Sequence, residues 1–179
     1  SDLAIALPSI ASVSKIELKT SMGDVRTKIV IEGGKIKSIE NADARVGPEI
    51  TVSNLFYNTP ARLKYLNSLY TELANICSYV NNMALSYPEI SFTLISDDKE
   101  LLNTDGSGNL LKVIKDIYGS NVARKMKKIS IYNDNYDVDG FISLPEVTRS
   151  SKKHMTTLVN KRVIRNVELN RCINEEYKK

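Results

Sequence analysis

The sequence contains no tryptophan, two cysteines and a single histidine, and these shortages exclude several kinds of site. Cys77 and Cys172 lack the paired spacing of a zinc site or a disulfide framework, which favours two packed thiols in a reducing compartment. His154 has no serine, cysteine or carboxylate pattern around it that would predict a catalytic triad. We therefore assign no catalytic residue and no metal ligand.

Long apolar runs are also missing, and none approaches the length of a membrane span. No charged and then apolar leader opens the chain. We expect an intracellular protein without membrane contact. The 179 residues, 42% hydrophobic and 26% charged, are typical of a globular chain with one generous domain or two small ones.

An excess of positive charge is missing from most of the chain and is concentrated in residues 147–179. The formal net charge is +4, yet this segment carries +6, so the remainder carries −2. An anionic partner such as nucleic acid is expected there, with a solvated basic rim as the alternative. The candidate phosphate contacts are the cations that flank a predicted strand over 154–160: Arg149, Lys152, Lys153, Lys161, Arg162 and Arg165.

The most informative local pattern is a strand that leads directly into a helix. Apolar residues nearly alternate over 49–55, as in a strand. Pro60 has its φ pre-set for a first helical turn, and the hydroxyl of Thr59 is placed to cap it. The sequence predicts a helix that starts at Pro60.

Further patterns predict an α+β order. Alternation predicts strands over 14–20, 25–32 and 35–39, with Gly33-Gly34 as a hairpin turn rather than a phosphate loop. A helix over 71–87 ends at Pro88, and we place a domain boundary near residues 86–90. The second half is predicted to contain strands 90–96, 100–104, 127–133, 136–144 and 154–160 and helices 109–118, 121–126 and 168–177.

Two motifs in the second half have competing interpretations. Residues 105–108 (Asp-Gly-Ser-Gly) resemble a phosphate-cradling loop, but a strand-to-helix connection capped by Asn109 or Ser107 is favoured because no Lys-Ser/Thr follows. Residues 135–146 have the oxygen-ligand spacing of a calcium loop. Their flanks alternate as strands, so we predict a β-hairpin turning at 133–135.

Several segments, in this order along almost the whole chain, resemble the MutL DNA mismatch-repair proteins: 6–15, Leu-Phe-Tyr-Asn-Thr-Pro-Ala-Arg at 55–62, 140–143 with 148–150, and Val-Asn-Lys-Arg-Val-Ile-Arg-Asn at 159–166. The resemblance implies that residues 1–87 form the C-terminal part of a GHKL-type ATPase α/β sandwich. Residues 88–179 would form most of a ribosomal-protein-like transducer domain with a left-handed β-α-β crossover.

The resemblance also implies a function for an intact parent protein. The parent would be an ATP-gated homodimeric clamp in the bacterial cytoplasm, near the nucleoid, which binds DNA non-specifically and couples a MutS-type mismatch sensor to strand incision. ATP and Mg²⁺ would serve that parent. The general-base Glu, the magnesium Asn and the phosphate-gripping Lys fall outside this chain, so no cofactor and no ATP hydrolysis are expected of the chain alone.

Ala6, Leu7 and Gly47 would line what remains of the nucleotide site, and the six cations named above would line the DNA groove. Two alternatives remain open. The chain could belong to another GHKL ATPase, such as a topoisomerase-like subunit, or it could be a protein-docking module whose basic rim meets an acidic partner.

Overall fold

The computed structural model describes residues 2–22, 25–43, 46–144, 147 and 155–177. The chain divides into two compact units, residues 1–68 and 69–179, and each is described here by itself. Both units combine helices with antiparallel strands, which confirms the predicted α+β class.

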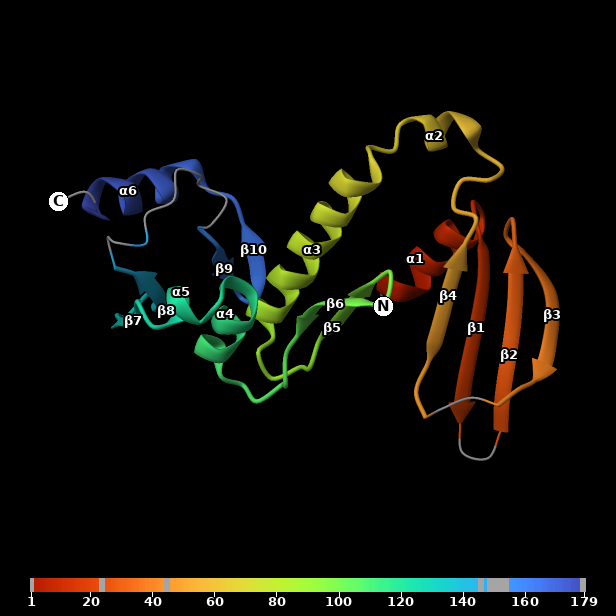
Figure 1. Cartoon of the computed structure of the whole chain (residues 1–179), viewed down its shortest axis with the longest axis horizontal. Coiled ribbons are helices and arrows are strands. Elements are labelled where there is room, and N and C mark those ends of the chain that lie inside the picture. Colours follow the sequence, from red (N-terminus) through yellow and green to blue (C-terminus); the bar gives the residue numbers. More distant parts are fainter. Residues whose placement is uncertain (1, 23–24, 44–45, 145–146, 148–154, 178–179) are drawn as a thin grey trace. The chain divides into compact units, whose positions relative to one another are not determined.

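The first unit is a four-stranded antiparallel sheet with the strand order β3-β2-β1-β4 (Figure 1). Its elements are α1 (Asp2–Ala11), β1 (Lys15–Met22), β2 (Val25–Glu32), β3 (Lys35–Asn41), β4 (Glu49–Ser53) and α2 (Pro60–Lys64). The predicted strands and the Gly33-Gly34 turn are confirmed, and both glycines adopt a positive φ. Positive φ at both positions is what a two-residue hairpin turn requires.

The two faces of this sheet differ in chemistry because side chains alternate along each strand. On one face Ile16, on the central strand β1, is almost fully buried. On the other face the Lys28 ammonium lies 3.1 Å from Glu17, and Lys19 lies 3.4 Å from both Glu17 and Glu49. Hydrogen bonding to Lys28 is the main cause that lowers the pKa of Glu17. The charged side chains named here therefore pair with one another on this face of the sheet.

Helix α1 was not expected from the sequence, which contains Pro8 within this stretch. A proline inside a helix removes one backbone hydrogen bond and disfavours helix. Leu7, Pro8 and Ala11 of α1 nevertheless border a cavity together with side chains of β1 and β2, so the helix packs on the apolar face of the sheet. Packing against the sheet outweighs the local preference.

The second unit contains three antiparallel strand pairs, β5 with β6, β7 with β8, and β9 with β10 (Figure 1). Its elements are α3 (Leu69–Ser86), β5 (Thr93–Ser96), β6 (Lys99–Asn103), α4 (Leu110–Tyr118), α5 (Ser120–Ala123), β7 (Met126–Tyr132), β8 (Asp137–Ser143), β9 (Thr157–Val159), β10 (Arg162–Ile164) and α6 (Val167–Tyr177). No ladder joins these pairs within the described ranges, so the left-handed crossover stays a prediction.

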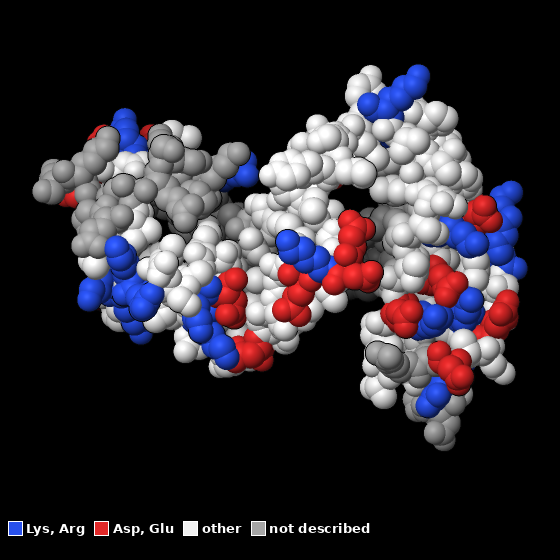
Figure 2. Space-filling view, viewed as in Figure 1, with Lys and Arg blue, Asp and Glu red and all other residues white. Residues whose placement is uncertain are grey.

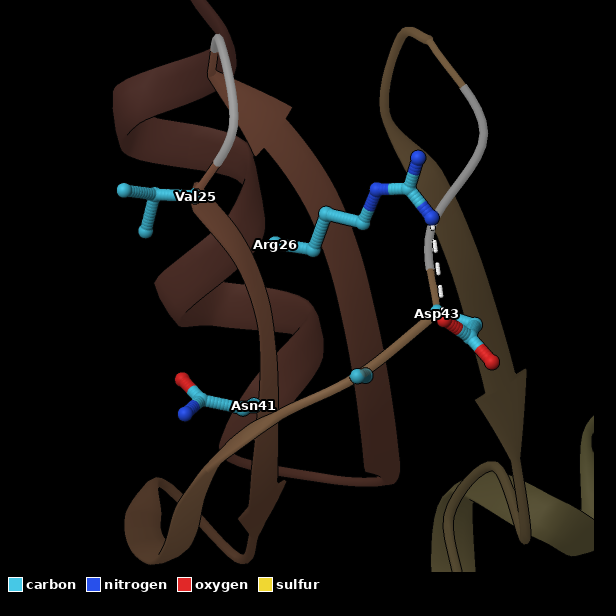
Figure 3. Close-up of a pocket in the computed structure, with 5 residues that line it drawn as sticks. Val25, Arg26, Asn41 and Asp43 are labelled. Carbon is cyan, nitrogen blue, oxygen red and sulfur yellow. Dashed lines mark ion pairs between the residues drawn. The ribbon is translucent and has the colours of Figure 1, made fainter.

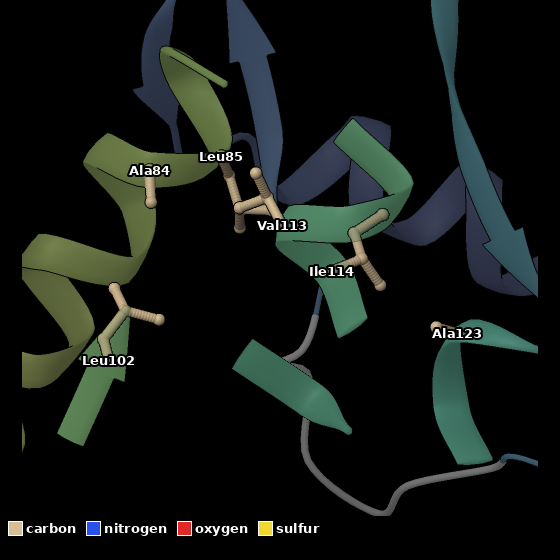
Figure 4. Packing of buried hydrophobic residues seen from close by; sticks show 6 residues of the cluster. All are labelled: Ala84, Leu85, Leu102, Val113, Ile114 and Ala123. Carbon is tan, nitrogen blue, oxygen red and sulfur yellow. The ribbon is translucent and has the colours of Figure 1, made fainter. Parts of the chain in front are cut away.

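The core of the second unit lies where α3, β6, α4 and α5 meet (Figure 4). The buried side chains of this cluster are Ala84, Leu85, Leu102, Val113, Ile114 and Ala123. Helix α3 contributes to this core from its C-terminal turn and thus packs with the second unit. The helix ends at Ser86, so it lies before the domain boundary that the sequence predicted near residues 86–90. The position of the domain boundary stays a prediction.

Most predicted elements of the second unit are confirmed, although the strand predicted over 90–96 begins only at Thr93 and the helix predicted over 121–126 ends at Ala123. The strand predicted over 154–160 is observed only as β9, and a second strand, β10, follows it directly. Asn160 and Lys161 form the turn between them, and both have a positive φ. Neither residue is glycine, so the sequence contains no strong hairpin signal at this point.

The two ambiguous motifs resolve as connections. Asn109 caps α4, since its Oδ1 accepts a hydrogen bond of 3.2 Å from the Lys112 amide. The calcium-like spacing lies on the β7–β8 hairpin, whose turn closes when the Asn133 amide donates to the Tyr136 carbonyl at 3.1 Å. Glu146 lies outside the described residues. In the part of the chain that the structure describes, no three metal-ligating side chains cluster and no helix is long and apolar enough to span a membrane.

Candidate nucleic-acid interface and the corner of the first unit

The corner at residues 55–62 is fastened to the segment that follows α1. The Phe56 amide donates to the Val13 carbonyl at 2.7 Å, and the Asn58 side-chain amide donates to the Ser12 carbonyl at 2.8 Å. Helix α2 then begins at Pro60, as predicted. This motif is a structural joint of the first unit.

The predicted capping role of the Thr59 hydroxyl is wrong. Thr59 has a φ of −134° and a ψ of 68°, and its side chain makes no capping hydrogen bond. The Oγ1 atom is buried and has no partner among the described residues. Its backbone carbonyl instead accepts the amide of Arg62 at 2.9 Å, so the chain enters α2 through backbone bonds.

The corner also reaches the Gly33-Gly34 turn. A Cβ atom at Gly33 would lie 2.9 Å from the Tyr57 hydroxyl, closer than carbon and oxygen pack without a shift. Gly33 has a φ of 56°, which also favours glycine. The aromatic side chain of the motif thus lies against a backbone that has no side chain to displace it.

Of the three residues predicted to line a nucleotide site, only Leu7 borders the cavity under α1. Leu7 lines an apolar cavity of about 280 Å³ between α1 and the sheet, and neither Ala6 nor Gly47 borders it. Ala6 is exposed on α1, and Gly47 lies in the open connection before β4 with a φ of 99°. None of the three carries a charged group for a phosphate or for Mg²⁺. These three residues alone would not bind ATP tightly, and their place beside a nucleotide stays a prediction.

A larger hollow of about 560 Å³ opens where β2 begins and β3 ends (Figure 3). It is lined by Val25, Arg26, Asn41, Ala42 and Asp43. The Arg26 guanidinium lies 3.6 Å from the Asp43 carboxylate, which is fully exposed to solvent. Among the described residues that line the hollow, this pair balances one positive and one negative charge, so they indicate no preference for an anion or a cation.

The predicted phosphate contacts that can be placed lie along the β9–β10 hairpin. Lys161 lies in its turn, Arg162 begins β10 and Arg165 directly follows it, and all three are exposed. Neither arginine forms an ion pair with a carboxylate among the described residues. Arg149, Lys152 and Lys153 lie outside the described residues.

Lys161 differs from these arginines because its charge is already engaged. Its ammonium lies 2.5 Å from a carboxylate oxygen of Glu89 and 5.0 Å from the ring centroid of Tyr87. Hydrogen bonding to Lys161 is the main cause that lowers the pKa of Glu89 below its ordinary value. The structure thus separates Lys161 from the two arginines that the sequence grouped with it.

A second group of cations was missed by the sequence reasoning. Arg124, Lys125, Lys127 and Lys128 place four positive charges within five residues at the start of β7. Figure 2 shows basic side chains gathered near the β7–β8 end of the second unit. The sequence shows this group as a short run of charges. The larger net charge of residues 147–179 drew attention away from it.

Comparison with known proteins identifies the chain. A family model described as DNA mismatch repair protein, C-terminal domain, matches residues 114–179. The chain is 49% identical over 173 residues to the DNA mismatch repair protein MutL of Geobacillus sp. (strain WCH70), a match that covers 96% of this chain. The chain belongs to the MutL family. MutL of Streptococcus equi subsp. equi (strain 4047) is likewise 49% identical, over 174 residues.

Solved MutL structures share the fold. The chain resembles the Aquifex aeolicus MutL ATPase domain complexed with ADP with a TM-score of 0.81 and 28% identity, over 97% of this chain and 68% of that chain. A second structure of the Aquifex MutL ATPase domain gives a TM-score of 0.80 at 25% identity, over 97% and 66% of the two chains. The expected relation to the GHKL-type ATPase domain of MutL is confirmed.

The chain spans 28% of the Geobacillus MutL and 26% of the Streptococcus MutL. The activity and partners of a complete MutL protein are therefore matters of proposal for this chain.

Proposed function

We propose that this segment of MutL forms part of the wall of a non-specific DNA-binding groove, in which Arg162 and Arg165 contact backbone phosphates. The observation that carries the proposal is the pair of exposed arginines on β10 and just after it, without an ion-pair partner among the described residues. A guanidinium held on a strand can bind phosphate oxygens with two parallel hydrogen bonds. Such contacts position a duplex without reading its sequence.

The proposal extends to an intact MutL protein. ATP and Mg²⁺ would close a homodimeric clamp over DNA, downstream of a MutS-type mismatch sensor in the bacterial cytoplasm, near the nucleoid. The support is membership of the MutL family and the complex of the Aquifex MutL ATPase domain with ADP. Arg149, Lys152 and Lys153 stay predicted groove contacts on their charge alone, and Ala6, Leu7 and Gly47 stay predicted neighbours of the nucleotide.

The test is duplex binding by the 179-residue chain, measured by fluorescence anisotropy over a salt series with and without an ATP analogue. Each phosphate contact contributes about 0.9 to the slope of log affinity against log salt, so Arg162→Glu with Arg165→Glu should lower that slope by about 1.8. We expect the double variant to abolish measurable binding at physiological salt while the circular dichroism spectrum stays unchanged.

A matched control is Lys35→Glu with Lys37→Glu, which makes the same charge change at exposed positions of β3 in the first unit. If binding depended only on general electrostatic attraction, both double variants would weaken it equally. Unchanged affinity in the arginine variant would overturn the proposal. If the chain binds an acidic peptide but no duplex, the protein-docking alternative is favoured instead.

A further inference from the structure

The turn between β9 and β10 holds a lysine in a backbone conformation that favours glycine. Asn160 and Lys161 have φ values of 49° and 64°, as in a two-residue hairpin turn that matches the twist of its strands. An L side chain is disfavoured in this region, and asparagine is tolerated better than lysine. A lysine at such a position is uncommon, which draws attention to the contacts that its side chain makes.

The Lys161 side chain reaches a segment 72 residues earlier in the chain. Its ammonium binds the Glu89 carboxylate at 2.5 Å and lies 5.0 Å from the centre of the Tyr87 ring. Both contacts are made by one cation on one short stretch directly after α3. A cation–π contact and a charge-assisted hydrogen bond together hold an ammonium in one place better than either does alone.

The receiving segment is itself anchored to the second unit. The Ile90 amide donates to the Tyr87 carbonyl at 2.9 Å, and the Gly108 amide donates to the Pro88 carbonyl at 2.9 Å. Helix α3, which ends just before Tyr87, contributes Ala84 and Leu85 to the buried core. The segment that carries the partners of Lys161 is therefore anchored to the core of the second unit.

We propose that Lys161 is a positioning residue, which fastens the β9–β10 turn to Glu89 and Tyr87 and thereby orients Arg162 and Arg165 toward phosphate. The proposal rests on the proposed function of the two arginines. It reassigns Lys161, which the sequence grouped with the phosphate contacts. The charge of Lys161 is already paired with Glu89 within the protein, so a phosphate would have to compete with that carboxylate for it.

The first arm of the test is independent of DNA. Native-state hydrogen exchange of the β10 amides is measured in the full chain with Glu89→Gln and, separately, with Lys161→Met. Exposed ion pairs and cation–π contacts are each modest, so exchange should accelerate about fivefold in either variant. Asp105→Asn is the matched control, because it removes another exposed carboxylate–lysine pair, with Lys112, in the same unit. Unaltered β10 exchange in both test variants would overturn the fastening.

The second arm separates positioning from phosphate contact by the direction of the change. It measures duplex affinity at about 0.15 M salt, where the Debye length is about 8 Å and long-range effects are damped. If Lys161 positions the arginines, Glu89→Gln weakens binding about fivefold with an unchanged salt slope. If Lys161 is a phosphate ligand, the same variant releases it, binding tightens and the slope rises by about 0.9.

A charge swap completes the second arm. Lys161→Glu alone should weaken binding, and Glu89→Lys with Lys161→Glu should restore affinity to within about twofold of the original chain because the ion pair is rebuilt in reverse. A swap as weak as Lys161→Glu alone would sink the positioning role. If the original chain binds no duplex, the proposed function is wrong, and the positioning role is wrong with it. The hydrogen-exchange measurement would still show whether Lys161 holds the β9–β10 turn against Glu89 and Tyr87.

Discussion

Replacing Gly33 by alanine tests how the residue 55–62 corner packs on the first hairpin. The substitution has two consequences in the structure. The φ of 56° becomes unfavourable, and the new Cβ lies 2.9 Å from the Tyr57 hydroxyl. Gly34→Ala is the matched control, because Gly34 has a φ of 78° but its Cβ would lie 3.6 Å from the Ser12 Cα, an ordinary contact.

The magnitudes follow from these two terms. An L residue in the left-handed region costs about 1–2 kcal/mol, and both alanine variants incur this cost. Both also gain the same few tenths of a kcal/mol or more from a less flexible unfolded chain. Gly33→Ala alone must displace the Tyr57 hydroxyl, which adds about 1 kcal/mol, near the lower end of overpacking costs, because Tyr57 is half exposed and can shift. The difference between the variants should be about 1 kcal/mol.

The assay is native-state hydrogen exchange of the β2 and β3 amides, which reports the opening free energy of the first unit itself. The two alanine variants are measured in the original chain and again with Tyr57→Phe. Removal of the hydroxyl should bring the two costs together. Equal costs in the original chain, or a difference that survives Tyr57→Phe, would refute the role assigned to the Tyr57 contact.

Two further predictions concern the second unit. Hydrogen bonding to Lys112 lowers the pKa of Asp105 from its ordinary 3.8 to about 2, so the stabilisation from this carboxylate is complete above pH 4 and is lost as the pH falls toward 2. The stability difference between the original chain and Asp105→Asn, measured by urea unfolding, should vanish over that interval; a constant difference would contradict the pairing. Asn109→Ala removes the cap of α4 and should destabilise it by about 1 kcal/mol, seen as faster exchange of the Val113 amide, while Asn109→Asp should retain most of the protection.

Features that depend on backbone conformation and on near neighbours could be predicted from the sequence alone. The Gly33-Gly34 pair and the alternation around it predicted the hairpin because only glycine accepts both turn conformations at no cost. Pro60 marked the start of α2, and Asn109 marked the cap of α4. In each case the residue and the backbone group that it serves lie within a few positions of one another.

The sequence showed how many cations each segment contains, but not which of them are paired in space. The excess of cations in residues 147–179 indicated a phosphate-binding surface, yet the same count could not distinguish Lys161 from Arg162. The distinction depends on Glu89, which reaches Lys161 only through the tertiary fold. The Thr59 hydroxyl also failed as a cap: the residue has a φ of −134° and a ψ of 68°, and its side chain makes no capping hydrogen bond.

The sequence by itself determined the α+β order, the hairpin and helix-start positions and the MutL motifs, because these depend on each residue's own conformational preferences or on near neighbours. Only the tertiary structure decided that residues 2–11 form a helix over the apolar face of the sheet, despite Pro8. It also decided which cations remain available to a partner. Both outcomes depend on contacts between segments far apart in the chain, which exist only once the chain has folded.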